Sequence, residues 1–353
     1  MQFGILKFRE TYMKRIWGGD RLQRVLGRNI HEAGPIGEAW LIADHPTCES
    51  VVAEGDHDGH TLRELMETDR DALLGTHAQP TKDGRFPLLL KLIDAGDVLS
   101  VQVHPDDACA LRLDEQDGGK TEMWHVLEAD PESTLISGLS ENTTRAAFEA
   151  ALAAGDPAPL MRSFPVAAGD SVFVAAGAVH AIGAGMLLAE IQQNSDITYR
   201  LFDWNRVDQN GVPRALHLEQ GLEAMDFTCD HGGRVAPLRY TTSGTVREVL
   251  AACPYFAAER IWVQGRACFD TRGASFHIIL ALDDVVSLVG TDTGCVLNRG
   301  EAALVPASVA EWHLEGAGSV LDYYVPDLDM DISMPLRRHG YSEAQIALLV
   351  SAD

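Results

Sequence analysis

The chain has 353 residues, of which 46% are hydrophobic, and it carries 28 lysines and arginines against 52 aspartates and glutamates. The resulting net charge of −24 disfavours nucleic acid and anionic membranes as partners. No stretch approaches the roughly 18 consecutive apolar residues of a transmembrane helix, and residues 1–14 lack the apolar core of a signal peptide. We therefore expect a cytoplasmic protein with reduced cysteines, long enough for two domains.

Helical patterns are few along the chain. Thr61 is a residue type that caps helices, Gly155 is one that ends them, and Ser342 with Gln345 forms a capping-box pattern. With the apolar spacing, these signals predict helices over residues 62–74, 141–154, 216–227 and 342–351. We expect the first two, at about 61–75 and 139–160, to form a small helical addition to a mainly β protein.

Short apolar runs bounded by Gly, Pro and Asp are typical of strands in a barrel or sandwich. They occur at residues 171–175, 186–192, 276–282 and 302–306. The segment from Gly169 to His180 has a weak counterpart that begins at Gly300 and has no histidine at the equivalent place. This repeat favours two copies of one barrel, of which only the first holds a metal site. We expect domains at residues 1–230 and 231–353, the second a degenerate barrel with a C-terminal helix.

The most informative stretch is residues 98–105. Side chains alternate along a strand, so Ser100, Gln102 and His104 share one face while Val101 and Val103 point the other way. A hydroxyl, an amide and an imidazole in a row need polar partners when they are buried, and a metal ion could satisfy Gln102 and His104 together.

Further metal-ligand types follow at Glu122 and His180. Two histidines, a carboxylate and an amide together fit a four-ligand metal site, of which His104, Glu122 and His180 are an ordinary set and Gln102 is a less usual member. The same two histidines and carboxylate could equally hold Fe(II).

The motifs around these residues resemble a known family. The segment 169–180 is similar to the second cupin motif, with Ala175 in place of the usual proline, and Gln102-x-His104 followed by Glu122 is similar to the first. Together with further motifs they resemble the type I phosphomannose isomerases, in particular the shorter bacterial branch. These segments are 17–19, 37–40, 86–91, 99–106, 119–124 and 190–200.

The resemblance implies a tandem cupin with two jelly-roll barrels and one Zn²⁺ per chain, held by Gln102, His104, Glu122 and His180. It implies interconversion of mannose 6-phosphate and fructose 6-phosphate through an enediol(ate). In that reaction a proton leaves C2 of the open-chain aldose and returns at C1, which requires a base and stabilisation of negative charge on oxygen.

The resemblance also assigns residues outside the metal site. It places Glu190, Lys120 and Arg200 in the active site. We expect Glu190 to take part in proton transfer, Lys120 to bind phosphate or transfer a proton, and Arg200 to bind phosphate or the enediolate. Ser100, on the face of Gln102, could donate a hydrogen bond to the phosphate.

Two other functions compete with this interpretation. One is an iron-dependent cupin oxygenase, against which Gln102, Lys120, Glu190 and Arg200 argue, because an oxygenase has no use for a phosphate-binding cluster. The other is a non-catalytic cupin that binds a sugar phosphate without turnover. A small-molecule sugar phosphate is the expected partner, and the lack of an apolar seam favours a monomer.

Overall fold

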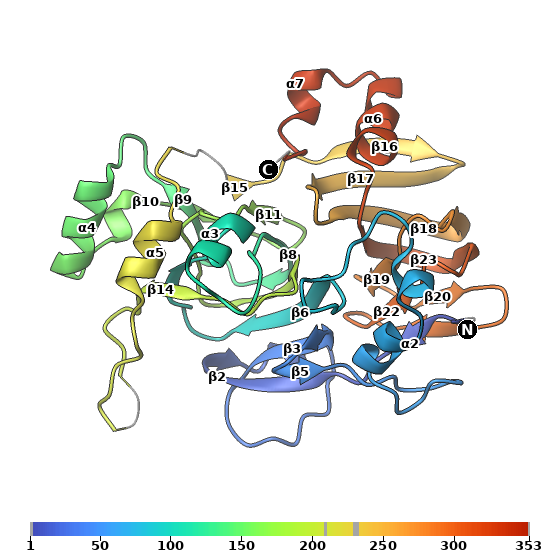
Figure 1. Cartoon of the computed structure of the whole chain (residues 1–353), viewed down its shortest axis with the longest axis horizontal. Coiled ribbons are helices and arrows are strands. Elements are labelled where there is room, and N and C mark those ends of the chain that lie inside the picture. Colours follow the sequence, from blue (N-terminus) through green and yellow to red (C-terminus); the bar gives the residue numbers. More distant parts are fainter. Residues whose placement is uncertain (1–2, 208–209, 229–232, 352–353) are drawn as a thin grey trace. The chain divides into compact units, whose positions relative to one another are not determined.

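The computed structural model describes residues 3–207, 210–228 and 233–351 (Figure 1). These residues form two compact units. Unit 1 comprises Met1–Thr11, Ala39–Leu92 and Val235–Asp353, and unit 2 comprises Tyr12–Glu38 and Ile93–Arg234. None of the described helices is long and apolar enough to cross a membrane.

Two antiparallel sheets organise unit 2. The first has five strands in the order β10 (Met161–Pro165), β9 (Thr134–Leu139), β12 (His180–Ile182), β7 (Val101–Val103) and β14 (Tyr199–Phe202). The second has the order β15 (Gly233–Arg234), β11 (Ser171–Val174), β8 (Glu122–Ala129), β13 (Met186–Gln193), β6 (Leu88–Ala95), β2 (Thr11–Gly19) and β3 (Ile36–Ile42). Strands β3 and β6 continue from one unit into the other.

Apolar side chains from both sheets of unit 2 meet in one core. Leu135 and Ile182 come from the five-stranded sheet, and Trp124, Val172 and Leu188 come from the other, all of them buried. This is the arrangement of a jelly roll, in which inward-facing residues of two sheets interdigitate. The helical elements of unit 2 are short, namely α1 (Arg21–Arg24), α3 (Asp107–Arg112), α4 (Arg145–Ala154), α5 (Leu218–Ala224) and the 3₁₀ turn η1 (Ala158–Leu160).

Unit 1 contains a nine-stranded antiparallel sheet. Its main path is β1 (Leu6–Lys7), β22 (Ala302–Val305), β19 (His277–Ala281), β23 (Glu311–Tyr324), β18 (Ala257–Asp270), β17 (Thr245–Ala252) and β16 (Leu238–Thr242). The strands β20 (Val286–Val289) and β21 (Gly294–Leu297) pair at its side, and β4 (Asp44–His45) with β5 (Cys48–Glu49) forms a separate pair. The helical elements of unit 1 are α2 (Leu62–Leu74), η2 (Leu328–Ser333), α6 (Met334–Arg338) and α7 (Glu343–Ile346).

The mainly β fold class is confirmed, and so are the strands predicted at 171–175, 186–192, 276–282 and 302–306, apart from one or two residues at their ends. The strand predicted over residues 98–105 is shorter, since β7 comprises only Val101–Val103, so that Ser100 and His104 flank it. Helix α2 has the predicted bounds. The predicted start of α4 at residue 141 is wrong, because the hydroxyl of Thr144 caps the helix by accepting from Ala147 N, while Asn142 has a φ of 63°. The other two helices, α5 and α7, are shorter than predicted. The domain division at 230/231 stays a prediction.

The two units repeat one register of strand pairing. In unit 2, β8 pairs with β11 so that Glu122 lies opposite Val174. In unit 1, β19 pairs with β22 so that His277 lies opposite Val305. Val174 and Val305 occupy the same place in the segments that begin at Gly169 and Gly300. His277 is therefore the positional counterpart of Glu122.

Backbone hydrogen bonds at the other end of these strand pairs support the same correspondence. Val126 N donates to the carbonyl of residue 170, and its own carbonyl accepts from residue 169. Ala281 makes the same two bonds with residues 301 and 300. The repeat predicted from the two glycine-led segments is thus confirmed in the strand pairing.

Candidate metal centre and active site

Three strands of unit 2 bring the predicted metal ligands together. Strand β12 begins at His180, which lies opposite Gln102 of β7. His104 follows β7 directly, and β8 begins at Glu122. The turn before β12 is fixed by Gly177, which has a φ of 83° and donates its N–H to the carbonyl of His104. The ligands therefore come from both sheets and converge between them.

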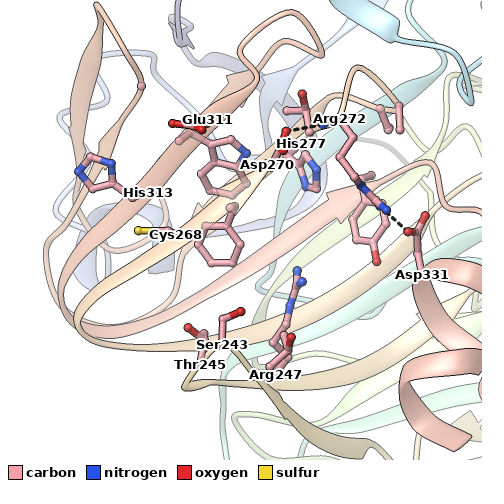
Figure 2. Close-up of a pocket in the computed structure, with 18 of the residues that line it drawn as sticks. Ser243, Thr245, Arg247, Cys268, Asp270, Arg272, His277, Glu311, His313 and Asp331 are labelled. Atoms are coloured by element: carbon pink, nitrogen blue, oxygen red, sulfur yellow. Dashed lines mark hydrogen bonds and ion pairs between the residues drawn. The ribbon is translucent and has the colours of Figure 1, made fainter. Parts of the chain in front are cut away.

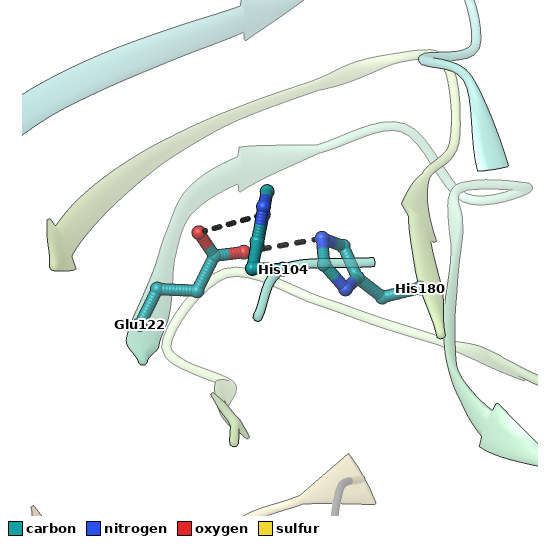
Figure 3. A group of neighbouring side chains, drawn as sticks. All are labelled: His104, Glu122 and His180. Atoms are coloured by element: carbon teal, nitrogen blue, oxygen red, sulfur yellow. Dashed lines mark ion pairs between the residues drawn. The ribbon is translucent and has the colours of Figure 1, made fainter. Parts of the chain in front are cut away.

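Figure 3 shows one carboxylate facing two histidines, with each of its oxygens paired to one of them. Glu122 Oε2 lies 3.5 Å from His104 Nε2, and Glu122 Oε1 lies 3.4 Å from His180 Nε2. One ligand atom from each of the three residues lies within 4.8 Å of the other two. All three side chains are buried, so bulk water does not supply hydrogen bonds to their polar atoms.

Backbone carbonyls orient both imidazoles. His104 Nδ1 lies 2.7 Å from the carbonyl oxygen of Ile197, and His180 Nδ1 lies 2.9 Å from that of Ala178. A proton on each Nδ1 leaves the Nε2 lone pairs facing Glu122, which is the usual arrangement of metal-binding histidines. Burial lowers the pKa of His104 to about 3, with Lys120 adding to the effect, and burial also lowers the pKa of His180. Both rings are therefore neutral and able to bind a metal.

Glu122 provides the charge that a cation would match. Among the described residues, its two buried oxygens accept no hydrogen bond, although Lys120 Nζ forms an ion pair with Oε2 at 2.9 Å. Burial opposes ionisation of Glu122, but the charge of Lys120 outweighs burial and holds the pKa of this carboxyl well below its usual range. Gln102 lies beside these three residues, with its amide nitrogen 3.2 Å from His180 Nε2. This donor set fits a divalent metal ion.

Lys120 and Glu190 lie beside the cluster. Lys120 Nζ is 3.2 Å from His104 Nε2. Burial disfavours its charge, but the carboxylates of Glu122 and Glu190 outweigh burial and raise the pKa of Lys120. Glu190 is itself buried, on β13.

Comparison with known proteins gives a consistent result. The family profile described as phosphomannose isomerase type I, catalytic domain, matches residues 5–127. The chain is 36% identical to a mannose-6-phosphate isomerase of Streptococcus mutans, over 86% of this chain and 92% of the relative. The chain belongs to the type I phosphomannose isomerase family. It is also 34% identical to the mannose-6-phosphate isomerase ManA of Bacillus subtilis, over 88% of this chain and 96% of that one.

Solved structures of phosphomannose isomerases have the same fold. The crystal structure of the mannose 6-phosphate isomerase from Bacillus subtilis superposes with a TM-score of 0.82 at 30% sequence identity, covering 91% of this chain and 99% of that one. The cupin-type fold expected from the sequence is confirmed by this match.

The remaining predicted site residues occupy neighbouring strand positions. Arg200 of β14 lies opposite Gln102 in the strand pairing, and its Nη1 donates to the carbonyl of Ala215 at 2.9 Å. Burial and the charge of Arg214 lower the pKa of Arg200. Ser100 is buried two residues before Gln102. The structure thus brings Gln102, His104, Lys120, Glu122 and His180 into contact. It places Glu190 and Arg200 on strands β13 and β14 and Ser100 directly before β7.

One residue of the site was not predicted. Trp124 Nε1 donates a hydrogen bond to Glu190 Oε2 at 2.8 Å, and the indole packs edge-on against the ring of His180 with 5.4 Å between centroids. The side chain is fully buried, and the sequence analysis assigns it no role in the site. The available signal is its spacing, because residues two apart on a strand share a face and Trp124 follows Glu122 by two.

Proposed function

We propose that this chain is a zinc-dependent aldose–ketose isomerase that interconverts mannose 6-phosphate and fructose 6-phosphate through an enediol(ate). The observation that carries the proposal is the buried cluster of His104, Glu122 and His180, whose donor atoms lie within 4.8 Å of one another in a chain of this family. The relatives are mannose-6-phosphate isomerases, which supports this reaction for the chain. The cluster could stabilise the negative charge that develops on the substrate.

In this proposal one Zn²⁺ per chain is held by Gln102, His104, Glu122 and His180. When bound, the metal supplies Lewis-acid stabilisation of the negative charge that develops on a substrate oxygen. The carbonyl-oriented histidines and the buried carboxylate support this assignment.

Glu190 is the proposed proton-transfer residue. Its carboxylate is buried beside Lys120, and the indole N–H of Trp124 holds one of its oxygens in place. A carboxylate fixed in this way can remove the C2 proton and return it at C1, provided that the other groups position these two carbons.

Lys120, Arg200 and Ser100 are the proposed partners of the substrate's anionic groups. The raised pKa of Lys120 keeps its ammonium charged, which suits binding of phosphate or enediolate oxygen, and a bound divalent cation would act against that shift. Arg200 offers a guanidinium with a buried Nε that has no partner among the described residues. Ser100 adds a hydroxyl donor on the face of Gln102.

The test is a coupled assay of fructose 6-phosphate formation from mannose 6-phosphate, on metal-stripped protein with and without added zinc. We expect turnover only with zinc. We also expect zinc to raise the melting temperature, because the metal binds the folded state and would satisfy the buried Glu122 oxygens, which accept no hydrogen bond among the described residues. Glu122→Gln should lose both effects. Glu128→Gln is the matched control, since Glu128 is on the same strand but partly exposed and paired with Arg24.

Other outcomes would contradict the proposal. Folded, zinc-bound protein that binds mannose 6-phosphate without turning it over would instead be a sugar-phosphate-binding protein. Oxygen uptake with bound Fe(II), and no isomerisation, would instead indicate an oxygenase that uses the same two histidines and carboxylate.

A further inference from the structure

A second cavity lies within unit 1, away from the residues discussed so far. It has a volume of about 880 Å³, which is within the size range of small-molecule sites. Figure 2 shows Arg247, Arg272 and His277 around it, with Asp270 and Glu311 at one side and Asp331 at the other. Nothing in the proposed isomerase reaction uses these residues.

The register repeat relates this cavity to the metal centre. Glu311 follows Gly300 at the spacing with which His180 follows Gly169. His180 lies opposite Gln102 in unit 2, and Glu311 lies opposite Asp270 in unit 1. Glu311 and Asp270 therefore occupy the positions of two proposed metal ligands.

The other strand pair extends the correspondence. His277 is the counterpart of Glu122, as shown above. Two residues further along, Trp124 lies opposite Glu190, and the equivalent Ile279 lies opposite Asp322. Asp322 therefore stands at the position of the proposed proton-transfer residue and accepts a hydrogen bond from His277 Nδ1 at 2.8 Å. The cavity is the second barrel's version of the active site.

The substituted side chains no longer form a metal centre. Within the part of the chain that the structure describes, only His104, Glu122 and His180 bring three such donors within 4.8 Å. Asp270, His277 and Glu311 line the same cavity without converging in this way.

The cations around the cavity are neutralised by carboxylates. Arg247 forms ion pairs with Glu259 at 2.6 Å and Asp322 at 3.0 Å, both buried. Arg272 forms an ion pair with Asp331 at 2.7 Å. Arg266, which also lines the cavity, lies 3.9 Å from a carboxylate oxygen of Glu315. An anion such as phosphate would therefore meet no arginine without a carboxylate partner here, and the acidic groups of the wall would repel it. The charge balance favours a neutral ligand.

The wall of the cavity suits hydroxyl groups. Arg272 and Glu311 line it at the surface of the fold. Trp312 also lines it, is 2% exposed and stacks on Phe269, with 4.4 Å between ring centroids. Hydroxyl groups both donate and accept hydrogen bonds, so they suit the paired arginines and carboxylates.

We propose that this cavity binds a neutral saccharide the size of a hexose, without metal and without catalysis. The ligand's hydroxyls would bridge the side chains of Arg272 and Glu311, beside Trp312. The proposal stands independently of the isomerase function, because it uses none of the proposed catalytic residues.

The test is a nuclear magnetic resonance titration of the full chain, labelled with ¹⁵N in its six tryptophan indoles. The probes are D-mannose, D-glucose and D-fructose, with inorganic phosphate and Zn²⁺ as comparisons. We expect at least one sugar to shift the Trp312 indole signal saturably in the millimolar range. The Trp124 indole reports on the metal centre of the same molecule, and Trp312→Phe assigns the signal.

Two variants check the site itself. Arg272→Ala and Glu311→Ala should each weaken the sugar affinity about tenfold, since each removes a charged hydrogen-bonding group. Both side chains are at the surface of the fold, so the variants should remain folded. Arg9→Ala is the matched control, because Arg9 is similarly exposed and forms an ion pair with Asp58 at 2.8 Å. It should leave the affinity unchanged.

Several results would overturn the proposal. One is the absence of a saturable Trp312 shift with all three sugars. Another is a shift confined to Trp124, which would place binding at the metal centre. A third is a saturable Trp312 shift with phosphate or Zn²⁺ alone, which would mean that the cavity is an ion site. If Arg9→Ala weakened the sugar affinity as much as Arg272→Ala, Arg272 could not be assigned to the binding site.

Discussion

Trp124 connects two groups of the active site at the scale of single residues. Its indole N–H holds Glu190, and its edge packs on His180. We expect Trp124→Phe to keep the packing and lose the hydrogen bond, so that kcat falls about ten- to hundredfold while KM changes little. Steady-state kinetics on zinc-loaded protein would measure this.

A comparable tryptophan serves as the control for that variant. Trp262 on β18 of unit 1 lies beneath the guanidinium of Arg239. Trp262→Phe should leave both constants unchanged. A Trp124→Phe enzyme with an unaltered kcat would show that Glu190 needs no help from the indole.

Part of the cluster of proposed metal ligands could be predicted from the sequence because alternation along a strand is a local property. Gln102 and His104 share a face whatever the rest of the chain does. The carbonyls of Ile197 and Ala178, which orient the two histidines, could not be predicted in this way. They carry no side-chain signal, and Ile197 comes 93 residues after the histidine it orients.

Helix α2 shows how local signals act at the scale of elements. Thr61 accepts from Glu64 N, and Glu64 accepts from Thr61 N, which is a complete capping box. Thr61→Ala should destabilise the fold by about 1 kcal/mol, measured as a lower denaturant midpoint. Thr68→Ala, in the same helix, removes a hydroxyl that bonds back to the carbonyl of Glu64, and it should have a smaller effect. Equal losses in the free energy of unfolding for the two variants would mean that the capping box stabilises the helix no more than the hydroxyl of Thr68.

The segment that follows β14 is held by a buried carboxylate. Asp203 accepts from Arg206 at 2.6 Å and from Arg214 Nε at 2.8 Å. Burial opposes its charge, but the two arginines outweigh burial and lower the pKa of Asp203. Because the folded pKa lies below the unfolded value of about 3.9, this charge stabilises the fold above about pH 4 and ceases to do so as the pH falls.

Asp203→Asn should therefore lower the melting temperature at pH 7, and the difference from the unmodified protein should shrink as the pH approaches 3. Thermal unfolding across a pH series would measure this. Asp58→Asn removes an exposed partner of Arg9 and should change little at any pH. A difference for Asp203→Asn that grows on acidification would contradict the assignment.

Element types were predictable, whereas several element ends were not. The alanine-rich pattern before Gly155 extends to residue 141, but the cap at Thr144 decides where α4 starts. The predicted helix after Ser342 has its capping box, yet it ends at Ile346. Apolar spacing indicates that a helix exists, whereas competing caps and tertiary contacts set its length.

The charge of −24 acts at the scale of the whole molecule. It repels a doubly charged sugar phosphate at long range, while buried Lys120 attracts it at short range. Salt screens the distant charges far more than the buried one. We therefore expect the KM for mannose 6-phosphate to fall as ionic strength rises from about 0.01 to about 0.15 M, with kcat unchanged. A rising KM would show that exposed cations near the site dominate.

The sequence predicted the fold class because it contains the family motifs, although these are concentrated in the first two thirds of the chain. It indicated the second barrel only by the segment after Gly300, since His277, Asp270 and Glu311 match no ligand motif. Their relation to the metal centre appears only when the strands are paired. The prediction of a monomer stays a prediction.

The shared register of β8 with β11 and of β19 with β22 has an evolutionary consequence. In our proposals, catalysis depends on a single copy of the barrel, so selection on the isomerase reaction leaves the duplicate's counterpart positions free to vary. Substitution at Asp270, His277 or Glu311 can then change what the duplicate recognises while the chemistry continues elsewhere. Relatives of this chain should accordingly diverge fastest in ligand preference at these three positions.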